Sequence, residues 1–356
     1  MEKYGYRFSF GPWNIHEGAD PFGPPVRPAR EFDDKLTVYQ ALGFDAVQFH
    51  DDDVVPGLDN LSPAQIRERA QVMRRKLADH GLVTEFVAPR LWEEPRTADG
   101  AYTANDPKTR AYALERTRKT VDIAREMGTN FMVVWFAREG TAMREAKDAI
   151  RATHQLLEAI NAVLDYDPDL RIAIEPKPNE PMDLSYIPTI GHGLALGFQA
   201  KDPARVGVLM ESAHAVLAGL DPSDEIAFAM AFGKLWGVHL NDQNSLKFDQ
   251  DRSFGAVDLR RAFNQVRVLD ENRYWEVGMV GLDVKALRTQ PAETATKHLR
   301  NSLHTFLRLV ELSRSLDRQA VNDLRAARDY EELDWVILRQ LMGGGGRGSE
   351  EWGSEQ

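Results

Sequence analysis

The sequence predicts a (β/α)8 TIM barrel with a short C-terminal helical arm. Strand-like and helix-like segments alternate from near the start of the chain, and eight of each can be assigned. Charged and aromatic residues follow the carboxyl ends of the predicted strands, where barrel enzymes build their active sites. A doubly wound open sheet is the alternative fold, but no Gly-x-Gly-x-x-Gly motif follows the first strand.

The strands are predicted from short apolar runs, which suit parallel strands that are covered on both faces. The clearest run is Ile172-Ala173-Ile174, which ends abruptly at a charged, proline-rich loop. The eight predicted strands are residues 7–13, 45–50, 83–88, 130–135, 172–174, 206–211, 235–240 and 273–277.

The helices are predicted from their start and stop signals. Ser62 is a good N-cap, Pro63 fits the first helical position, and Gly43, Gly81 and Gly128 are typical helix stops. The predicted helices are residues 30–42, 62–80, 106–127, a segment ending near 164, 187–199, 222–232, 258–269 and 284–312. We expect a catalytic barrel at 1–312, a helical arm at 313–342 and a flexible tail at 343–356.

Composition excludes several classes of function. The chain has 356 residues, no cysteine and a net charge of −11, so thiolate metal ligands are impossible and a nucleic-acid partner is disfavoured. The N-terminus lacks an apolar signal core, and no apolar run reaches membrane-spanning length. We therefore expect a cytoplasmic enzyme that binds neither nucleic acid nor membrane.

The loop after the fifth strand carries the first functional signal. Glu175 and Lys177 alternate there with Pro176, Pro178 and Pro181. Proline fixes φ and removes N–H donors, so this loop is stiff and cannot extend the sheet. A solvated surface turn is one interpretation. The other is that the loop holds a metal and a polar substrate.

Acidic and imidazole residues also follow the later strands. Each one alone is more typical of a salt bridge, but several carboxylates in one partly dry cleft would be costly without compensating cations. The candidate metal ligands are Glu175, Glu211, His214, His239, Asp249, Asp251 and Glu276.

Two spacings in the sequence indicate how these candidate ligands are shared between two cations. Glu211-x-x-His214 and Asp249-x-Asp251 each place two ligands close together, and Glu211 is suited to bridging two ions. Oxygen and imidazole ligands favour Mn²⁺, Mg²⁺ or Co²⁺. We expect one cation at Glu175, Glu211, His239 and Glu276, and a second at Glu211, His214, Asp249 and Asp251.

Several motifs occur in an order that is recognisable. They are Phe10-Gly11-Pro12-Trp13, Asp20-Pro21-Phe22-Gly23, Phe49-His50-Asp51-Asp52-Asp53, Tyr102-Thr103-Ala104-Asn105-Asp106, Arg138-Glu139-Gly140, residues 175–181, Leu240-Asn241-Asp242-Gln243-Asn244 and Lys247-Phe248-Asp249-Gln250-Asp251. From Phe8 to about Asp258 the chain resembles the xylose isomerase family of metal-dependent aldose–ketose isomerases.

The resemblance implies catalytic roles for matching positions. His50, oriented by Asp53, would assist opening of the cyclic sugar, and Lys177 would hold the carbonyl oxygen. Near Asp251 a proton would pass between the oxygens on C1 and C2, while a hydride shifts between those carbons. Two cations and an ammonium would stabilise the developing alkoxide.

The resemblance also implies a substrate pocket and an oligomer. Trp13 and Trp135 would form an apolar wall that excludes water, although ordinary core filling explains aromatic residues equally well. Phe22 would reach into the site of a neighbouring subunit in a homo-oligomer, a dimer or a tetramer. The abbreviated C-terminal arm leaves the geometry of that oligomer open.

Several positions depart from the family pattern. His239 and Glu276 stand where the isomerase pattern has Asp, and the ligand set resembles that of L-rhamnose isomerase and the ketose 3-epimerases. A Lys that follows the last ligand is replaced around Gly278. Arg90 and Trp92 replace Asn and Phe in the pocket. Arg90 would hold an anionic or more oxidised substrate, or would pair with Glu93 or Glu94.

The favoured function is a sugar isomerase that uses two metals and a 1,2-hydride shift. The alternative is a sugar epimerase, or a related lyase, with Glu175 and Glu276 as an acid–base pair around one metal. A non-catalytic sugar-sensing barrel is a third possibility, and the acidic charge disfavours a metal-dependent nuclease. The sequence does not name the sugar.

Overall fold

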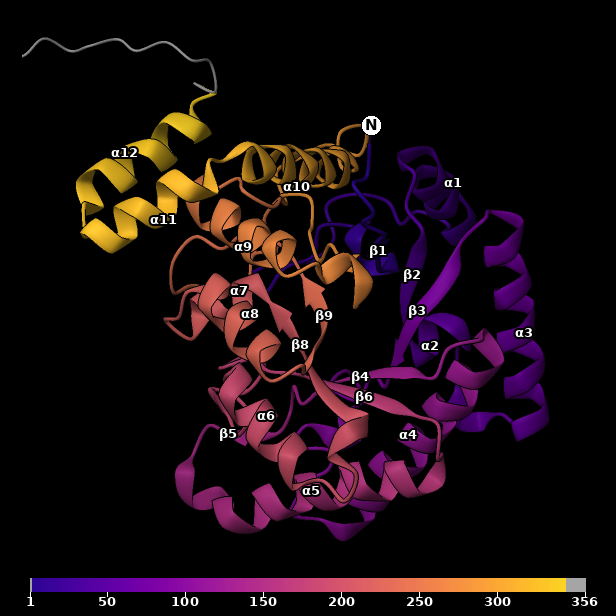
Figure 1. The fold of residues 1–356 in the computed structure, drawn as a ribbon. Coiled ribbons are helices and arrows are strands. Elements are labelled where there is room, and N and C mark those ends of the chain that lie inside the picture. The colour runs from indigo at the N-terminus through magenta and orange to yellow at the C-terminus, as the bar shows by residue number, and fades with distance from the viewer. Residues whose placement is uncertain (1, 344–356) are drawn as a thin grey trace, which may run out of the picture.

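The computed structural model describes residues 2–343, which form a closed barrel of parallel strands surrounded by helices (Figure 1). Around the barrel the strands follow the order β1-β10-β9-β8-β6-β4-β3-β2. The predicted (β/α)8 fold is therefore confirmed. The barrel strands are β1 (Phe8–Phe10), β2 (Ala46–His50), β3 (Val83–Ala88), β4 (Phe131–Trp135), β6 (Arg171–Glu175), β8 (Val206–Glu211), β9 (Leu235–His239) and β10 (Val280–Gly281).

The eighth strand is not where the sequence pattern placed it. The predicted strand at 273–277 is instead a 3-10 turn, Tyr274–Glu276, and Arg273 before it has a positive φ of 56°. The segment resembles a strand because it is rich in aromatic and apolar residues. Tyr274 is fully buried, however, and its hydroxyl donates to the carbonyl of Met279 over 3.2 Å. The true strand begins after this turn.

Helices cover the outside of the barrel in the expected positions, with one large exception. Residues 284–296 form a loop, so the last barrel helix, α10 (Lys297–Ser315), begins later than predicted. The others are α1 (Phe32–Leu42), α2 (Asp51–Val54), α3 (Pro63–Asp79), α4 (Pro107–Met127), α5 (Ala149–Tyr166), α6 (Ile190–Gln199), α7 (Ser212–Leu217), α8 (Pro222–Ala231) and α9 (Leu259–Glu271).

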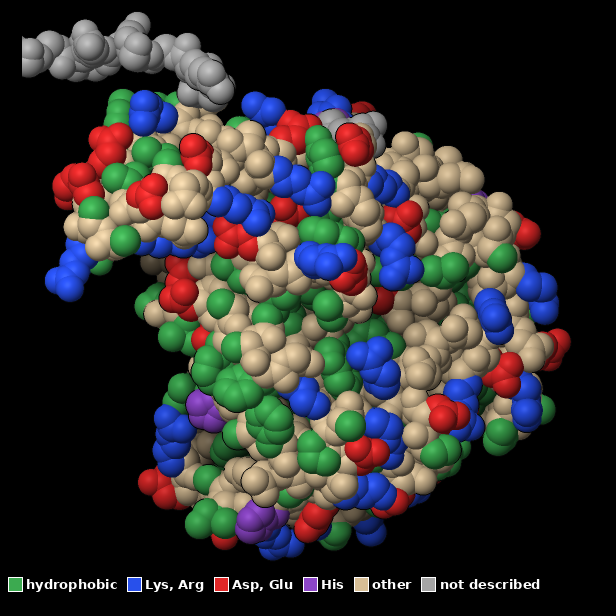
Figure 2. Space-filling view, viewed as in Figure 1, with side chains coloured by type: hydrophobic (Ala, Val, Ile, Leu, Met, Phe, Trp, Pro, Cys, Tyr) green, Lys and Arg blue, Asp and Glu red, His purple; other side chains and the backbone are tan. Residues whose placement is uncertain are grey.

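Two helices follow α10, in the region predicted to be the helical arm. They are α11 (Arg318–Ala327) and α12 (Tyr330–Leu341), and they project from one side of the barrel (Figure 1). Charged side chains of both signs cover the face of this pair that is seen in Figure 2. The domain boundary at 312 stays a prediction, and the predicted flexible tail lies, apart from Gly343, outside the described residues.

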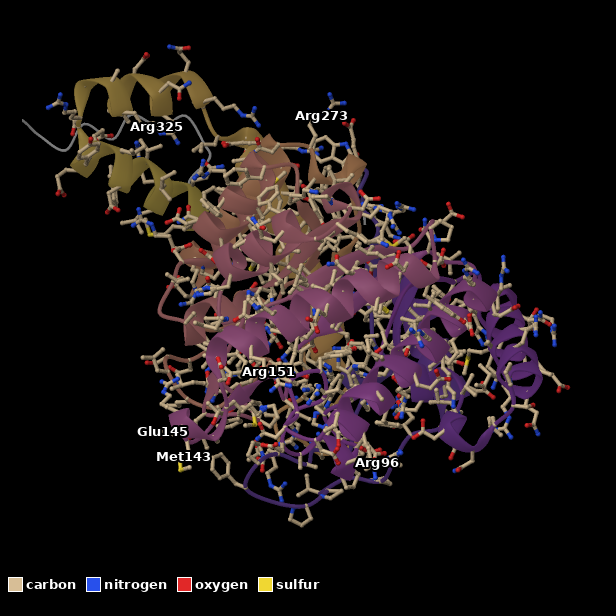
Figure 3. All side chains as sticks on the ribbon, turned by 90° about the horizontal axis from the view of Figure 1, so that it is seen from below. Arg96, Met143, Glu145, Arg151, Arg273 and Arg325 are labelled. Atoms are coloured by element: carbon tan, nitrogen blue, oxygen red, sulfur yellow. The ribbon has the colours of Figure 1, made fainter. Side chains whose placement is uncertain are left out.

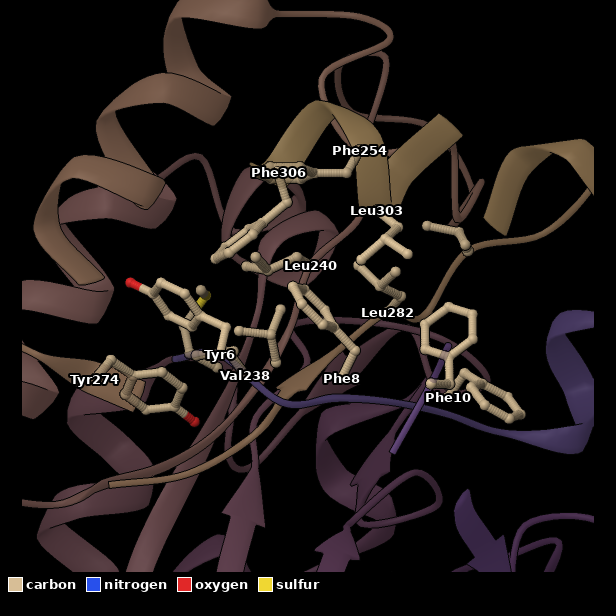
Figure 4. Packing of buried hydrophobic residues seen from close by; sticks show 14 of the residues in the cluster. Tyr6, Phe8, Phe10, Val238, Leu240, Phe254, Tyr274, Leu282, Leu303 and Phe306 are labelled. Atoms are coloured by element: carbon tan, nitrogen blue, oxygen red, sulfur yellow. The ribbon is translucent and has the colours of Figure 1, made fainter. Parts of the chain in front are cut away.

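The wall of the barrel near β1 is packed with aromatic rings. Tyr6 and Phe8 contact Phe306 of α10 edge to face, with centroid distances of 4.9 and 5.4 Å (Figure 4). All three side chains are fully buried. Such pairs add packing energy to the burial of large apolar surfaces. This contact holds α10 against β1, which pairs with β10 and so closes the barrel.

A short antiparallel sheet lies over the carboxyl ends of β4 and β6. It pairs β5 (Gly140–Thr141) with β7 (Leu184–Ser185). Buried Glu139 supports it, because its carboxylate accepts hydrogen bonds from the backbone N–H groups of Ala101, Tyr102 and Thr103 over 2.8–3.0 Å. The loops after three strands are thereby tied together above the barrel.

Asp51 ties the end of β2 to the outer helices. Its fully buried carboxylate accepts two hydrogen bonds from Arg116 of α4, over 2.6 and 2.8 Å, and one from Thr120 over 3.0 Å. It also accepts a backbone hydrogen bond from Arg90 in the loop after β3, over 3.2 Å. A bidentate pair of this kind fixes geometry as well as charge. Asp51 therefore sets the position of two loops at the barrel mouth.

We predict that Asp51→Asn lowers the free energy of unfolding by about 3 kcal/mol, because the buried guanidinium of Arg116 would lose its nearest carboxylate and keep only the longer contacts with Asp52 and Asp59. Urea denaturation followed by circular dichroism measures the change. Asp33→Asn is the matched control, since Asp33 is exposed and pairs with Lys76 at the surface. That control should change stability by at most about 1 kcal/mol. Equal effects of the two substitutions would contradict the prediction.

Candidate metal centre and active site

The carboxyl ends of the barrel strands enclose a cavity of about 260 Å³. Its wall is acidic and basic on one side and aromatic on the other. The lining residues are Trp13, His50, Phe86, Ala88, Arg90, Trp92, Glu93, Trp135, Glu175, Lys177, Glu211, His214, His239, Asp249, Asp251, Asp283 and Lys285. Most of the candidate site residues chosen from the sequence therefore meet in one place.

Glu211 lies at the centre of the acidic side. Its carboxylate belongs to three groups of possible metal ligands, and within each group the ligand atoms lie within 4.8 Å of one another. Glu211 is buried at the end of β8, which fixes its position. The three groups are Glu175 with Glu211 and His214, Glu211 with His239 and Asp283, and Glu211 with Asp249 and Asp251.

His239 turns one ring nitrogen toward the carboxylates. Its Nδ1 lies 3.2 Å from Glu175 Oε1, 3.7 Å from Glu211 Oε2 and 3.8 Å from Asp283 Oδ2. Gly281 of the adjacent strand makes room for the ring, since a Cβ at position 281 would lie 2.8 Å from His239 Cδ2. The imidazole therefore lies among these carboxylates, and its role as a metal ligand stays a prediction.

Asp249 lies beside His214 and Lys177. Asp249 Oδ2 accepts a hydrogen bond from Lys177 Nζ over 2.8 Å and lies 3.2 Å from His214 Nε2. Its other oxygen, Oδ1, is buried and has no hydrogen-bond partner among residues 2–343. A buried, unpaired carboxylate oxygen is costly. The donor set of carboxylates and imidazoles, with this free oxygen among them, fits a divalent cation.

Asp251 is held by two side chains. Its Oδ2 accepts a hydrogen bond from Lys285 Nζ over 2.5 Å, and its Oδ1 accepts one from Asn241 Nδ2 over 3.1 Å. The same Asn241 amide donates to Glu211 Oε1 over 2.9 Å. Asn241 therefore fixes the spacing of the two carboxylates. Sequence reasoning noticed Asn241 in a motif but did not assign it this role.

The crowding of carboxylates shifts their pKa values in opposite directions. Burial raises the pKa of Glu211 and of Asp251, and the charge of Asp249 adds to both effects. Burial would also raise the pKa of Glu175, but His239 and His214 lower it to about 2. In return, although burial opposes the charge on His239, the neighbouring carboxylates raise its pKa. The cluster is short of positive charge.

The structure contradicts the assignment of Glu276 as a metal ligand. Its side chain is 51% exposed and pairs with Arg273, which Figure 3 labels at the periphery of the molecule. Glu276 lies before the eighth strand rather than after it, because that strand begins at Val280. Asp283 follows the strand and lies with Glu211 and His239 in one of the three groups of possible ligands.

The later start of the eighth strand also changes the expectation that a lysine after this strand is replaced around Gly278. Lys285 follows Asp283 by two residues, and both line the cavity, so a lysine does stand just after the eighth strand. The Asp283-x-Lys285 pair is the sequence signal for this strand end.

The aromatic side of the cavity surrounds His50. Trp13 and Trp92 pack on this ring with centroid distances of 4.5 and 4.8 Å, and Trp135 packs on Trp92 at 4.6 Å. Trp13 also donates a hydrogen bond from its indole nitrogen to Asp283 over 2.8 Å. The three tryptophans therefore line the cavity, where the family resemblance placed Trp13 and Trp135, and Trp13 contacts a candidate ligand. Substrate binding by these rings stays a prediction.

Arg90 pairs with partners other than those considered from the sequence. Its guanidinium lies 3.0 Å from Asp52 and 2.9 Å from Asp53, and not against Glu93 or Glu94. Burial would raise the pKa of Asp53, but contacts with His50 and the charge of Arg90 lower it to about 2. The charge of Arg90 is therefore balanced within the protein.

Phe22 does not line the cavity of its own chain. Its side chain is 78% exposed and contacts Phe248 edge to face, with a centroid distance of 5.1 Å.

None of the helices in the described part of the chain combines the length and apolarity that crossing a bilayer requires.

Comparison with known proteins agrees with this architecture. The model of the xylose isomerase-like TIM barrel family matches residues 36–321. The chain is 36% identical over 336 residues to xylose isomerase from Thermus thermophilus. This alignment covers 91% of this chain and 84% of the Thermus protein.

Solved structures show the same fold at low sequence identity. A 3-keto-D-glucoside 4-epimerase from E. coli matches with a TM-score of 0.60 and 13% identity, covering 84% of this chain and 99% of that one. A D-psicose 3-epimerase matches with a TM-score of 0.57 and 13% identity, covering 86% and 98%. By sequence and by fold, the chain belongs to the xylose isomerase-like TIM barrel family.

Proposed function

We propose that this protein is an aldose–ketose isomerase that acts on a small neutral sugar with the help of two divalent cations. The observation that carries the proposal is the meeting of five carboxylates and two imidazoles around Glu211, beside the ammonium of Lys177. The identity to a xylose isomerase over most of the chain supports this choice of reaction.

The two cations would share Glu211. When bound, they would supply Lewis acidity that polarises the oxygens on C1 and C2 of the sugar. The imidazole of His239 is a softer ligand than a carboxylate, so we expect Mn²⁺ or Co²⁺ to be preferred over Mg²⁺. The first cation would be held by Glu175, Glu211, His239 and Asp283, and the second by Glu211, His214, Asp249 and Asp251.

Lys177 would hold the carbonyl oxygen of the substrate. Its ammonium is buried at the cavity wall, 5.0 Å from the centre of the Trp135 ring. Burial would favour the neutral amine, but Asp249 and Glu211 raise the pKa of Lys177. The group therefore stays charged at neutral pH and can stabilise negative charge that develops on the carbonyl oxygen.

Asp251 would handle the proton that passes between the oxygens on C1 and C2. Lys285 and Asn241 fix its orientation at the cavity wall. The tryptophan wall would keep water from the carbons between which the hydride moves.

An epimerase that uses Glu175 and Glu276 as its acid–base pair is not compatible with this geometry. Glu276 pairs with Arg273 outside the cavity, so it cannot reach a sugar bound beside Glu175. The competing chemistry is that other residues of the cavity remove a proton from a sugar carbon and return it, as an epimerase does.

A cytoplasmic location and a homo-oligomer in which Phe22 enters a neighbouring site stay predictions.

Isotope labelling distinguishes the two chemistries. Pentoses, hexoses and deoxyhexoses are first tested with Mn²⁺, and the sugar that reacts is then converted in D₂O. We expect no deuterium on carbon in the product, because a hydride shift transfers hydrogen directly between C1 and C2. Proton NMR of the product measures the label. One deuterium per turnover would show that a base removes the proton, and the isomerase mechanism would be wrong.

The role of Lys177 is tested by Lys177→Met, which keeps the length of the side chain and removes its charge. We expect kcat to fall by about 10²–10³, the usual loss when one donor to a developing oxyanion is removed. Lys247→Met is the matched control on the exposed loop before Asp249. If Lys177→Met retains nearly full turnover, Lys177 does not polarise the carbonyl.

Cation binding is tested by its effect on stability. We predict that Mn²⁺ raises the melting temperature of the metal-free protein, because a cation would compensate the crowded carboxylates and binds only the folded state. At equal concentration Mg²⁺ should stabilise less. Differential scanning calorimetry measures both shifts.

Two variants show whether the correct residues were chosen. Glu211→Gln should abolish the stabilisation by Mn²⁺, since both groups of ligands share this carboxylate. Glu276→Gln should leave it unchanged, because Glu276 lies outside the cavity. The assignment of ligands is refuted by a loss of stabilisation in the Glu276 variant or by full stabilisation in the Glu211 variant.

A further inference from the structure

One ring nitrogen of His50 lies close to both a hydrogen-bond acceptor and a hydrogen-bond donor. His50 Nδ1 lies 3.1 Å from Asp53 Oδ2, which can only accept a hydrogen bond when it is ionised. The same Nδ1 lies 2.6 Å from Arg90 Nη2, which can only donate. A single nitrogen cannot carry a proton toward Asp53 and also accept one from Arg90. One of the two contacts must determine where the proton of His50 resides.

Asp53 does not need the ring proton. Its Oδ2 already accepts the backbone N–H of His50 over 3.0 Å, and its Oδ1 accepts a hydrogen bond from Arg90 Nη2 over 2.9 Å. A protonated Nδ1 at 2.6 Å from an N–H of Arg90 would instead place two hydrogens against each other. With Nδ1 unprotonated, Arg90 donates to Nδ1 and to Asp53 Oδ1, while Asp53 Oδ2 keeps the hydrogen bond from the backbone N–H of His50.

The guanidinium of Arg90 is not free to move away. Its Nη1 lies 3.0 Å from Asp52, and its own backbone N–H donates to Asp51 over 3.2 Å. Asp51 is in turn bound to Arg116 on α4. These contacts hold Arg90 from several directions, and Asp52 and Asp53 neutralise its charge. The anionic substrate considered from the sequence would have to displace them.

The other ring nitrogen of His50, Nε2, has no part in these contacts. His50 lines the cavity, with Trp13 and Trp92 packed on its ring. Because Nδ1 is occupied by Arg90 and Asp53, Nε2 is the nitrogen left to a molecule in the cavity. A neutral imidazole with an unprotonated Nδ1 carries its proton on Nε2.

We propose that Arg90 is a positioning residue that holds His50 in the Nε2–H tautomer, so that His50 offers the substrate a hydrogen-bond donor and not an acceptor. For the identity of the ligand, this inference rests on the proposed function. His50 then selects an acceptor oxygen, such as the ring ether oxygen of a cyclic sugar or a carbonyl oxygen of its open form. It does not take a proton from a hydroxyl group. Asp53 anchors Arg90 and does not set the tautomer.

The tautomer can be measured without substrate or turnover. In metal-free protein labelled with ¹⁵N-histidine, NMR separates protonated from unprotonated ring nitrogens, and His50→Asn identifies the His50 resonances. We expect the proton of neutral His50 on Nε2 in the unmodified protein. In Arg90→Met, Asp53 is left as the neighbour of Nδ1, and we expect the proton to move to Nδ1.

Two further variants control the experiment. In Asp53→Asn the proton should stay on Nε2, because Arg90 still donates to Nδ1. In Arg96→Met, which removes a nearby guanidinium that pairs with Glu94 and Asp59, His50 should be unaffected. A protonated Nδ1 in the unmodified protein, or an unchanged tautomer in a folded Arg90→Met, would overturn the proposal. Because no turnover is measured, failure of the isomerase assignment would leave this test intact.

Discussion

The convergence of like charges on Glu211 is the constraint on which the rest of the site depends. Carboxylates from four strand ends meet there in a buried environment, where unpaired negative charge is strongly unfavourable. Lys177 and Lys285 each pair with one of them, but they leave Asp249 Oδ1 without a partner among the described residues. The cluster persists because the closed barrel holds its strands in fixed register against the electrostatic repulsion between these carboxylates.

A second layer of charge supports the first. Asp51, Asp52 and Asp53 follow β2 directly, and each pairs with a guanidinium, either Arg90 or Arg116. This layer connects the loop after β3 and helix α4 to the aromatic side of the cavity. The two layers have different purposes. The inner one is short of positive charge and suits cations, whereas in the outer one each carboxylate has a guanidinium partner and the layer fixes the position of His50.

Much of this arrangement could be predicted from the sequence. Seven strands were placed correctly because apolar runs, glycine stops and N-caps agree with one another there. The eighth failed because Tyr274, Trp275 and Val277 have high β propensity, while the true strand is very short and contains Gly281. The error carried Glu276 into the ligand set and left Asp283 out. The partners of Arg90 could not be predicted, since they depend on how the turn after β2 faces the loop after β3.

The crowded backbone at Gly281 restricts how the surroundings of His239 can change. Ser9, Gly281 and His239 are neighbours on adjacent strands, and Gln48 reaches the same point from β2. A methyl group at position 281 would lie 2.5 Å from the Gln48 amide, 2.7 Å from the carbonyl oxygen of Val238 and 2.8 Å from the His239 ring. Because one of these contacts is with backbone, replacing the His239 ring would not make room for a side chain at position 281. Sequence change during evolution can therefore alter position 239, but glycine must stay at position 281.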